Sequence, residues 1–487
     1  MEYTSQQKQA LESIEQFLKS KNSIFVLKGY AGTGKTTLVS PIIKIAEETG
    51  RNCQLMALTG RAAKILGEKT GCSASTIHKS IYEFSSAKIT TGNENIESKV
   101  MFRFSLRSMD GHNDIGLKQD PESTLLIVDE ASMIGANKQT ESMYVFGSGF
   151  LLRDLIKYAN LSRGGKILFI GDPCQLPPIG DEESPALDTE LLEEYYGGVE
   201  SFELTEVIRQ DMNSIIKRNS LKLRNLINSN SGKSLVLERR KGEVEDINYT
   251  EIPDRFCELT PSPSLKGPVV ICWSNRQAAH YNSRIRNIYF PNNDGTIRVG
   301  DRLMVVTNNY MLGGRHILNG EPCQVVKVSK KVETLTGPYY EGKSEGKNRY
   351  ISVNLNFRNV SLLFEDGIVV KTKIMDNLIG SEEANLSYRE QCALQANFNE
   401  RHKDLKRGSR EYIEAAMHDP YLNAVRVKYG YSITCHKAQG GEWDTVFVDF
   451  RGRVGLNVEC LRWSYTALTR ARKTIYGYQL HDRSLRP

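Results

Sequence analysis

A glycine-rich loop near the N-terminus carries the first residues whose types and spacing point to chemistry. Residues 29–36, GYAGTGKT, match the pattern G-x-x-x-x-G-K-[ST] in full. The apolar run at 23–28 predicts a buried strand before the loop, and residues 37–49 predict a helix that ends at Gly50. In this arrangement backbone N–H groups surround phosphate oxygens, and the helix N-terminus adds positive potential. The loop therefore predicts a binding site for nucleotide phosphates.

The side chains of this loop have specific predicted roles. Lys35 is expected to hold the β- and γ-phosphates of ATP, and the Thr36 hydroxyl is expected to ligate Mg²⁺. Pro41, inside the predicted helix, should kink the helix or mark a 3₁₀ first turn. The loop residues predicted to bind ATP are Gly32, Thr33, Gly34, Lys35, Thr36 and Thr37.

An acidic pair follows a second apolar run, at residues 125–128. A carboxylate at the end of such a strand completes the Mg²⁺ shell in many nucleotide sites, so Asp129 is predicted to bind the metal. Glu130 is predicted to polarise the attacking water, a base role that fits hydrolysis. The alternative is that both residues only cap a strand end.

A third apolar run, at residues 166–170, ends in the loop GDPCQLPP at 171–178. Loops at the carboxyl ends of parallel strands form the ligand crevice of an α/β sheet. Gln175 is therefore predicted to reach the γ-phosphate or its water. A rigid, proline-stiffened turn that leaves the sheet explains the segment equally well.

Composition bounds the class of protein. The chain has 487 residues, a length that suggests about three or four domains. Hydrophobic residues make up 39% of it, which is enough to form buried cores. Its net charge of +6 suits a polyanionic partner without requiring one. Nine scattered cysteines lack metal-site spacing and suggest reduced thiols. The polar start and the lack of a long apolar run favour a soluble protein of a reducing cytoplasm without a membrane partner.

Taken in order, the motifs resemble those of the superfamily 1 DNA helicases, specifically the RecD-like group. Residues 4–10 resemble the adenine-reading Q motif, with Gln7 as the reader and Gln6 as a rival. The loops at 29–37, 127–132 and 171–178 correspond to motifs I, II and III. The further segments that resemble family motifs are 57–63, 75–78, 204–210, 431–442 and 463–472.

The resemblance implies that two distant arginines, Arg209 and Arg470, reach the γ-phosphate. Arginines that approach from a second domain would stabilise transition-state charge and would make ATP binding close the two domains. A surface ion pair is the alternative for Arg209. Gly441 and Glu442, in the segment that resembles motif V, are assigned to the nucleotide site on the same basis.

Nucleic-acid contacts are also implied, chiefly to the backbone, because a motor must step over any sequence. The loops concerned follow predicted strands of both motor domains. The residues predicted to contact nucleic acid are Thr59, Gly60, Arg61, Thr76, His78, Phe102, Asn275, Thr434, His436 and Lys437.

The motif map predicts two RecA-like P-loop motor domains of α/β fold with two inserts. The first motor domain covers 1–80 and 120–185, and the second covers 186–292 and 428–487. Residues 81–119 form an insert with period-two alternation around Phe102, which predicts a half-buried strand. In the family this position carries a β-hairpin pin that splits the duplex. Phe102 or Met101 would stack on the last base pair there, unless the phenylalanines are simply the core of the insert.

Residues 293–427 predict short strands, with Asn319-Gly320 as a hairpin signal. Further strands are expected at 350–357 and 360–364, and the family inserts an SH3-like β-barrel here. Residues 330–349 are predicted to be a solvated, mobile loop, and 376–420 are predicted to be helical. The basic cluster at 403–410 fits either a DNA contact or a solvated helix face.

The resemblance thus implies an ATP- and Mg²⁺-dependent helicase that moves 5′→3′ on single-stranded DNA and opens forked duplex DNA. It would function as a monomer, with replication or repair proteins as possible partners. The residue types determine neither the direction of movement along the strand nor whether the strand is DNA or RNA. An RNA translocase or a nucleoprotein-remodelling translocase is therefore an alternative. A P-loop switch or scaffold that binds protein is the alternative from another class.

Overall fold

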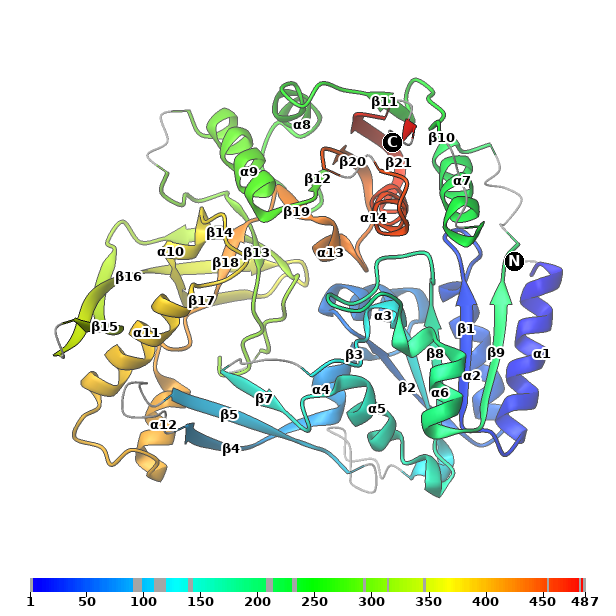
Figure 1. Cartoon of the computed structure of the whole chain (residues 1–487), viewed down its shortest axis with the longest axis horizontal. Helices are drawn as coiled ribbons and strands as arrows, with labels where there is room; N and C mark the ends of the chain where they lie inside the picture. The colour runs from blue at the N-terminus through cyan, green and yellow to red at the C-terminus, as the bar shows by residue number, and fades with distance from the viewer. Residues whose placement is uncertain are drawn as a thin grey trace.

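Two parallel sheets, a small hairpin sheet and an antiparallel sheet make up the molecule (Figure 1). The computed structural model describes residues 3–90, 99–108, 120–138, 143–206, 213–229, 234–291, 295–312, 315–344, 347–452, 455–480 and 483–484. In this part of the chain, none of the helices combines the length and apolar character that crossing a lipid bilayer requires. All nine cysteines are free thiols.

The first sheet carries the glycine-rich loop, and all of its strands run parallel. Strands β6 and β8 are buried along their whole length, as expected for a sheet with helices on both faces. The strand order is β3 (Ala74–Thr76), β2 (Asn52–Ala57), β6 (Thr124–Asp129), β8 (Lys166–Gly171), β1 (Ile24–Gly29) and β9 (Val199–Leu204). The accompanying helices are α1 (Ser5–Lys19), α2 (Val39–Glu48), α3 (Gly60–Thr70), α4 (Ile77–Ile81), α5 (Leu151–Ala159) and α6 (Thr189–Tyr196).

Strand β9 corrects the predicted boundary of the first motor domain at residue 185. It pairs in parallel with β1, from Ile24↔Val199 to Gly29↔Leu204. The chain leaves the first sheet only after residue 204. The sequence obscured this because β9 is only partly buried at the sheet edge, and its mixed composition gives no strong strand signal.

A short 3₁₀ turn, Thr36–Leu38, separates the glycine-rich loop from α2. Pro41 lies in the first turn of α2, where the missing N–H of proline removes no helical hydrogen bond. The predicted 3₁₀ start of this helix is confirmed.

The second sheet is also parallel throughout. Its order is β11 (Val244–Asp246), β21 (Ala471–Tyr478), β20 (Trp443–Asp449), β12 (Val269–Cys272) and β19 (Ser432–Thr434). The strands therefore come from two separated segments of the chain, as the motif map predicts. Its helices are α7 (Ile215–Ser229), α8 (Ile252–Leu259), α9 (Asn275–Tyr289), α13 (Cys435–Ala438) and α14 (Val458–Leu468), and β10 (Ser234–Leu235) pairs with β22 (Arg483–Ser484).

A three-stranded sheet contains the predicted hairpin. Strands β4 (Tyr82–Thr90) and β5 (Lys99–Leu106) are antiparallel, and β7 (Tyr144–Phe146) adds in parallel to β5. The insert predicted at 81–119 therefore recruits a strand from beyond its predicted end. The tip between β4 and β5, residues 91–98, lies outside the described residues.

Phe102 belongs to the core of this sheet. Its side chain is 0% exposed and stacks on Tyr144, with ring centroids 5.9 Å apart. The prediction that Phe102 contacts nucleic acid is therefore wrong for this structure, and the alternative of a core residue holds. Met101, on the opposite face of β5, is half-buried.

Residues 302–429 contain an antiparallel sheet in the form of a half-barrel, shown in yellow-green at the left of Figure 1. Gly320 adopts φ +87°, and its N–H donates to Val305 O at 2.9 Å, so the predicted turn is confirmed. The strands are β13 (Arg302–Val305), β14 (Pro322–Val328), β15 (Glu333–Ser344), β16 (Lys347–Phe364), β17 (Val369–Met375) and β18 (Val427–Tyr429).

Two predictions for this sheet are wrong. The segment 330–349, expected to be a mobile loop, contains β15 and the start of β16, paired along most of their length. The two strands expected at 350–364 form the single strand β16. Cross-strand hydrogen bonds order a polar hairpin that composition alone assigns to solvent. The expected helices are present as α10 (Asp376–Ile379), α11 (Tyr388–Arg401) and α12 (Arg410–His418).

Candidate functional site: a glycine-rich loop and an acidic pair beside a second domain

The glycine-rich loop follows β1 and closes over the start of α2. Gly32 and Gly34 both adopt φ +81°, a conformation that side chains strongly disfavour, so these two positions require glycine. Thr37 N–H donates to Gly34 O at 3.0 Å, which starts the helix. Lys35 Nζ donates to Tyr30 O at 3.0 Å and so lies over the loop. The predicted phosphate-binding residues thus form one continuous cradle.

Thr36 and Asp129, the predicted Mg²⁺ ligands, lie together. The Thr36 hydroxyl donates to Asp129 Oδ2 at 3.3 Å, although 93 residues separate them in the chain. Strands β6 and β8 are neighbours, and β8 is next to β1, so the strand-end loops meet at one edge. A hydroxyl and a carboxylate are the oxygen donors that Mg²⁺ prefers, so these residues fit that ion.

Glu130 has φ 53°, a left-handed conformation that is unusual for this residue type. Burial raises the pKa of Asp129, and burial together with the negative charge of Asp129 raises the pKa of Glu130. The positive charges of Arg470 and Lys35 oppose this rise at Glu130. Strained backbone and shifted carboxylates mark this pair as a candidate chemical centre.

The loop after β8 lies against the same cradle. Gln175 is buried, and its Oε1 has no hydrogen-bond partner in the described part of the chain. An orphaned buried acceptor next to a phosphate cradle supports a role in binding a ligand or its water. Sequence reasoning missed Asp172 in this loop, which is 0% exposed and lies 3.9 Å from Lys35 Nζ through its Oδ2.

Gln7 touches the glycine-rich loop directly. Its Nε2 donates to Thr33 O at 3.0 Å, and its Oε1 accepts from Thr4 N–H at 3.0 Å as part of a helix capping box. Gln6, its rival, instead bonds Thr205 and Glu206 beyond β9. The structure therefore favours Gln7 over Gln6 for contact with a nucleotide, and its reading of adenine stays a prediction.

Arg470 comes from the second sheet and lies at the end of α14. Its guanidinium donates to Thr466 O at 3.1 Å and to Gly441 O at 3.3 Å. Glu442 accepts from Arg472 at 3.0 Å through its carboxylate. Gly441 and Glu442 thus lie beside Arg470, and their contact with nucleotide stays a prediction. Arg209 lies outside the described residues.

Side chains of α14, and of Gln439 directly after α13, bond to loops that follow strands of the first sheet. The Tyr465 hydroxyl donates to Asp172 Oδ2 at 2.7 Å and accepts from Ala31 N–H in the glycine-rich loop at 2.8 Å. Leu176 N–H donates to Thr466 Oγ1 at 2.9 Å, and Gln439 Nε2 donates to Leu176 O at 2.8 Å. Sequence reasoning missed these contacts because residues some 290 positions apart carry no shared local signal.

The predicted nucleic-acid residues of the first sheet lie at helix starts. The Thr59 hydroxyl caps α3, and the Thr76 hydroxyl caps α4. Gly60 and Arg61 follow Thr59, and the Arg61 guanidinium lies 4.1 Å from the Trp443 ring centroid. His78 packs edge-on against Phe146, and burial lowers its pKa to about 4. At neutral pH His78 is therefore uncharged.

The corresponding residues of the second sheet lie at the ends of two paired strands. Strand β12 pairs with β19, with Cys272 opposite Thr434. Asn275 begins α9 directly after β12, and His436 and Lys437 lie on α13 directly after β19. Burial lowers the pKa of Lys437 to about 8. These four predicted residues therefore share one edge of the sheet.

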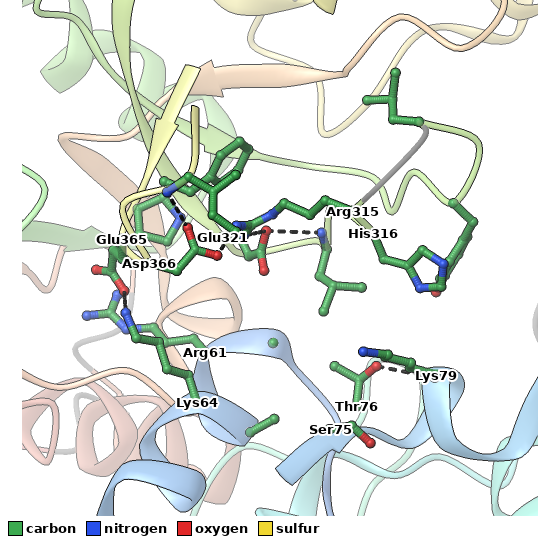
Figure 2. A pocket seen from close by; sticks show the side chains of 18 of the residues that line it. Arg61, Lys64, Ser75, Thr76, Lys79, Arg315, His316, Glu321, Glu365 and Asp366 are labelled. Carbon is green, nitrogen blue, oxygen red and sulfur yellow. Dashed lines mark hydrogen bonds and ion pairs between the residues drawn. The ribbon is translucent and has the colours of Figure 1, made fainter. Parts of the chain in front are cut away.

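A cleft of about 840 Å³ lies between α3, β3 and α4 on one side and the antiparallel sheet on the other (Figure 2). Arg61, Lys64 and Lys79 line the first side. Lys64 crosses the cleft to Glu365 at 3.5 Å, and Arg315 pairs with Glu321 at 3.1 Å. Lys64, Lys79 and Arg315 were missed by sequence reasoning, although Lys79 stands only three residues after Thr76.

Comparison with known families agrees with this geometry. A family model described as AAA domain matches residues 2–247, just over half of the 487-residue chain. A second model, described as UvrD-like helicase C-terminal domain, matches residues 429–476. The two matches fall on the segments that build the two parallel sheets.

Relatives align along most of the chain at low identity. The uncharacterized protein R530 of Acanthamoeba polyphaga mimivirus is 24% identical over 92% of this chain and 93% of its own length. The ATP-dependent RecD2 DNA helicase of Deinococcus radiodurans is 25% identical over 93% of this chain. The present chain spans about half of that relative, 46% of its length. The Pif1 helicase from Bacteroides, crystallised with ADP-AlF3 and single-stranded DNA, aligns with 98% of this chain and 92% of its own, at 18% identity and TM-score 0.44.

A complete glycine-rich loop, an acidic pair and an arginine from the second domain thus lie close together, in a chain whose N-terminal half matches the AAA model. The chain belongs to the AAA-domain family, and its segment 429–476 matches the UvrD-like helicase C-terminal domain.

Proposed function

We propose that this protein is an ATP-dependent DNA helicase that moves 5′→3′ along single-stranded DNA and opens forked duplex DNA. The observation that carries the proposal is the contact between the two parallel-sheet domains beside the glycine-rich loop. Tyr465 and Thr466 of the second domain bond to loops of the first, and the positive charge of Arg470 acts on Glu130. A site shared by two domains converts nucleotide binding and hydrolysis into relative motion. The RecD2 and Pif1 relatives, named as helicases, support the activity.

Within this function, the first sheet supplies the chemistry. Lys35 and the backbone of the glycine-rich loop bind the β- and γ-phosphates, and Gln7 lies beside the loop to meet the base. Thr36 and Asp129 would hold Mg²⁺, which when bound neutralises phosphate charge. Glu130 orients the water and accepts its proton, while the free Oε1 of Gln175 binds the water or the γ-phosphate.

Arg470 supplies the link between the two domains. Its present partners are two carbonyl oxygens and the Thr469 hydroxyl, all neutral, which a phosphate oxygen can outcompete because a hydrogen bond between charged groups is stronger. Movement of Arg470 toward the γ-phosphate would bring α14 and the second sheet with it. Arg209 is proposed for the same role on the basis of sequence alone.

For the strand path, we propose that the cleft in Figure 2 holds part of the single strand against α3 and α4. Lys64 and Lys79 would bind phosphates, together with the backbone at Thr59, Gly60 and Thr76. Asn275, Thr434, His436 and Lys437 would continue the path on the second sheet. Backbone contacts of this kind are indifferent to sequence, which a translocating protein requires.

The two inserts have proposed roles that follow from the resemblance. The β4–β5 hairpin would act as the pin that splits the duplex, and the half-barrel sheet would be the family's SH3-like barrel. The proposed domains are 1–204 with the hairpin insert 81–119 and β7, then 205–292 with 428–487, then 293–427. We further propose that the protein acts as a monomer in the cytoplasm, with replication or repair proteins as partners.

The decisive experiment measures ATP hydrolysis with no nucleic acid and with single-stranded DNA or RNA of equal length. We expect DNA to stimulate turnover strongly, and Lys35→Ala to abolish turnover under every condition. Stimulation by RNA alone would replace the DNA assignment, and indifference to both would leave a nucleotide switch. Forked duplexes with a single 5′ or 3′ tail then test polarity, because unwinding from the 3′ tail alone contradicts the proposed direction.

A further inference from the structure

The Tyr465 hydroxyl occupies an unusual position between the two sheets. Tyr465 lies on α14 of the second sheet and is 1% exposed. Its hydroxyl donates to Asp172 Oδ2 at 2.7 Å and accepts from Ala31 N–H at 2.8 Å. Both partners belong to loops at the strand ends of the first sheet, beside Lys35. One side-chain oxygen therefore joins two loops of one domain to a helix of the other.

Two groups, the Tyr465 hydroxyl and the Lys35 ammonium, lie near the same carboxylate oxygen of Asp172. Its Oδ2 accepts from Tyr465 at 2.7 Å, whereas Lys35 Nζ lies at 3.9 Å from that oxygen, a weak ion-pair distance. Asp172 Oδ1 accepts from Cys174 N–H at 3.0 Å. Because the carboxylate is 0% exposed, leaving its oxygens without hydrogen-bond partners would be costly. Tyr465 supplies one of these bonds, so Asp172 does not depend on Lys35 alone.

We propose that Tyr465 is a positioning residue that keeps Lys35 available to ATP by satisfying Asp172 with its hydroxyl. The inference rests on the proposed ATP chemistry of Lys35. Without the hydroxyl, Lys35 becomes the main charged partner of a buried carboxylate and moves from its weak contact into a close ion pair. The phosphates must then compete with Asp172 for the same ammonium group.

The same helix connects this position to Arg470. Thr466, next to Tyr465, accepts from Leu176 N–H at 2.9 Å, and its carbonyl accepts from Arg470 Nε at 3.1 Å. A change at the Asp172 loop therefore reaches the arginine through adjacent residues of α14. The hydroxyl of Tyr465 thus links the Asp172 loop beside Lys35 to the helix that precedes Arg470.

The test compares Tyr465→Phe with Tyr281→Phe as a matched control. The Tyr281 hydroxyl also donates to a buried aspartate, Asp449 Oδ2, at 2.8 Å, within the second sheet and away from the glycine-rich loop. Nucleotide affinity is measured by equilibrium binding of a fluorescent ATP analogue, and KM and kcat are measured with single-stranded DNA. We expect Tyr465→Phe to weaken nucleotide binding about tenfold or more and to raise KM, and Tyr281→Phe to leave both unchanged.

Asp172→Asn distinguishes positioning from simple loss of structure. An asparagine carries no charge to hold Lys35, so adding Asp172→Asn to Tyr465→Phe should restore most of the lost nucleotide affinity. Additive losses in the double variant, or unchanged affinity in Tyr465→Phe, would overturn the inference. Direct binding separates this result from the proposed function, because nucleotide affinity is measurable even in a protein that no nucleic acid stimulates.

Discussion

At the scale of single residues, the nucleotide site combines charge, burial and strain in a small space. Asp129 and Glu130 are adjacent, burial raises the pKa of both, and Glu130 has a left-handed backbone. Asp172 lies fully buried beside Lys35. Such arrangements destabilise a fold and persist where they serve a ligand. The site is therefore expected to lower the free energy of unfolding of the ligand-free protein.

The variant Glu130→Gln tests this effect on the free energy of unfolding. We expect the variant to lose hydrolysis by about 10²–10⁴-fold while the nucleotide-free protein gains about 1 kcal/mol of unfolding free energy, or about 2 °C. The sign of the pH dependence follows from the raised pKa values. The folded protein binds these protons more tightly than the unfolded chain, so wild-type stability declines as pH rises through the raised pKa values.

Calorimetry across pH, with Glu12→Gln as control, provides the measurement. Glu12 is exposed on α1. The Glu130→Gln stability curve should decline less with rising pH than the wild-type curve, whereas Glu12→Gln should follow the wild type. A destabilised Glu130→Gln protein with an unchanged pH profile would contradict the interpretation.

At the scale of elements, the hairpin is built into the core of the molecule. Val100 N–H donates to Gln395 Oε1 of α11 at 3.1 Å, and Phe104 lies 5.3 Å from Tyr310 between ring centroids. Hairpin residues share one apolar cluster with the first sheet and with α11 and α12. In Figure 1, β4 and β5 run beside α12 in the lower part of the view. This packing holds β5 against α11 and against the segment that contains Tyr310.

Phe102→Ala measures how firmly the hairpin is anchored. Because Phe102 is 0% exposed, its truncation should lower the unfolding free energy by about 3–5 kcal/mol. Phe84→Ala is the matched control, since Phe84 lies on the same sheet but is 39% exposed and should cost much less. Guanidinium unfolding of both variants gives the comparison. Unchanged stability with impaired unwinding in Phe102→Ala would restore the discarded hypothesis that this ring stacks on the duplex.

At the scale of the whole molecule, the two parallel sheets touch through α3 and the loop before β20. Arg61 stacks on Trp443 at 4.1 Å and donates to Glu442 O at 3.4 Å. A Cβ on Gly440 would lie only 3.0 Å from Ala62 Cβ, so the backbones approach closely. The predicted role of Arg61 in nucleic-acid binding thus competes with an observed contact between domains. Relative motion of the sheets must alter this contact.

Trp443 can report that motion. The chain has three tryptophans, and Trp443 has an indole N–H without a hydrogen-bond partner in the described part of the chain. In the variant Trp273→Phe/Trp463→Phe, we expect Trp443 emission to change when a non-hydrolysable ATP analogue and single-stranded DNA bind. Trp273→Phe/Trp443→Phe is the control, because Trp463 is 0% exposed and packs edge-on against Phe450 of its own domain. Constant Trp443 emission at saturation would argue against closure through this contact.

Lys79→Ala tests the proposed strand path across the whole molecule. Removing one phosphate contact should weaken single-stranded DNA binding at low salt and reduce the log–log salt slope by about 1. Lys8→Ala is the control. Lys8 is exposed on α1, far from the cleft, so this variant should change neither quantity. Fluorescence anisotropy over a salt series measures both. An unchanged slope in Lys79→Ala would remove this residue from the strand path.

Much of the nucleotide site was predictable because its chemistry is local. Lys35 and Thr36 stand in one loop, Asp129 and Glu130 follow one apolar strand, and Pro41 indicated the 3₁₀ start of α2. The order of such segments also predicted two parallel sheets. Local patterns predicted the edge strands of the sheets less well. Strands β9 and β15 carry polar residues, and pairing with a neighbouring strand is what orders them.

The sequence by itself thus determined the nucleotide cradle, its acidic pair and the two-sheet plan, because short-range backbone geometry and buried apolar strands set them. Only the tertiary structure decided which distant side chains complete them. Tyr465 meets Ala31 across 434 positions, and Lys64 meets Glu365 across 301. It also decided that Phe102 is core rather than surface, since alternation predicts burial of one face without saying what covers it. Such contacts depend on how separately formed elements pack, which no local pattern encodes.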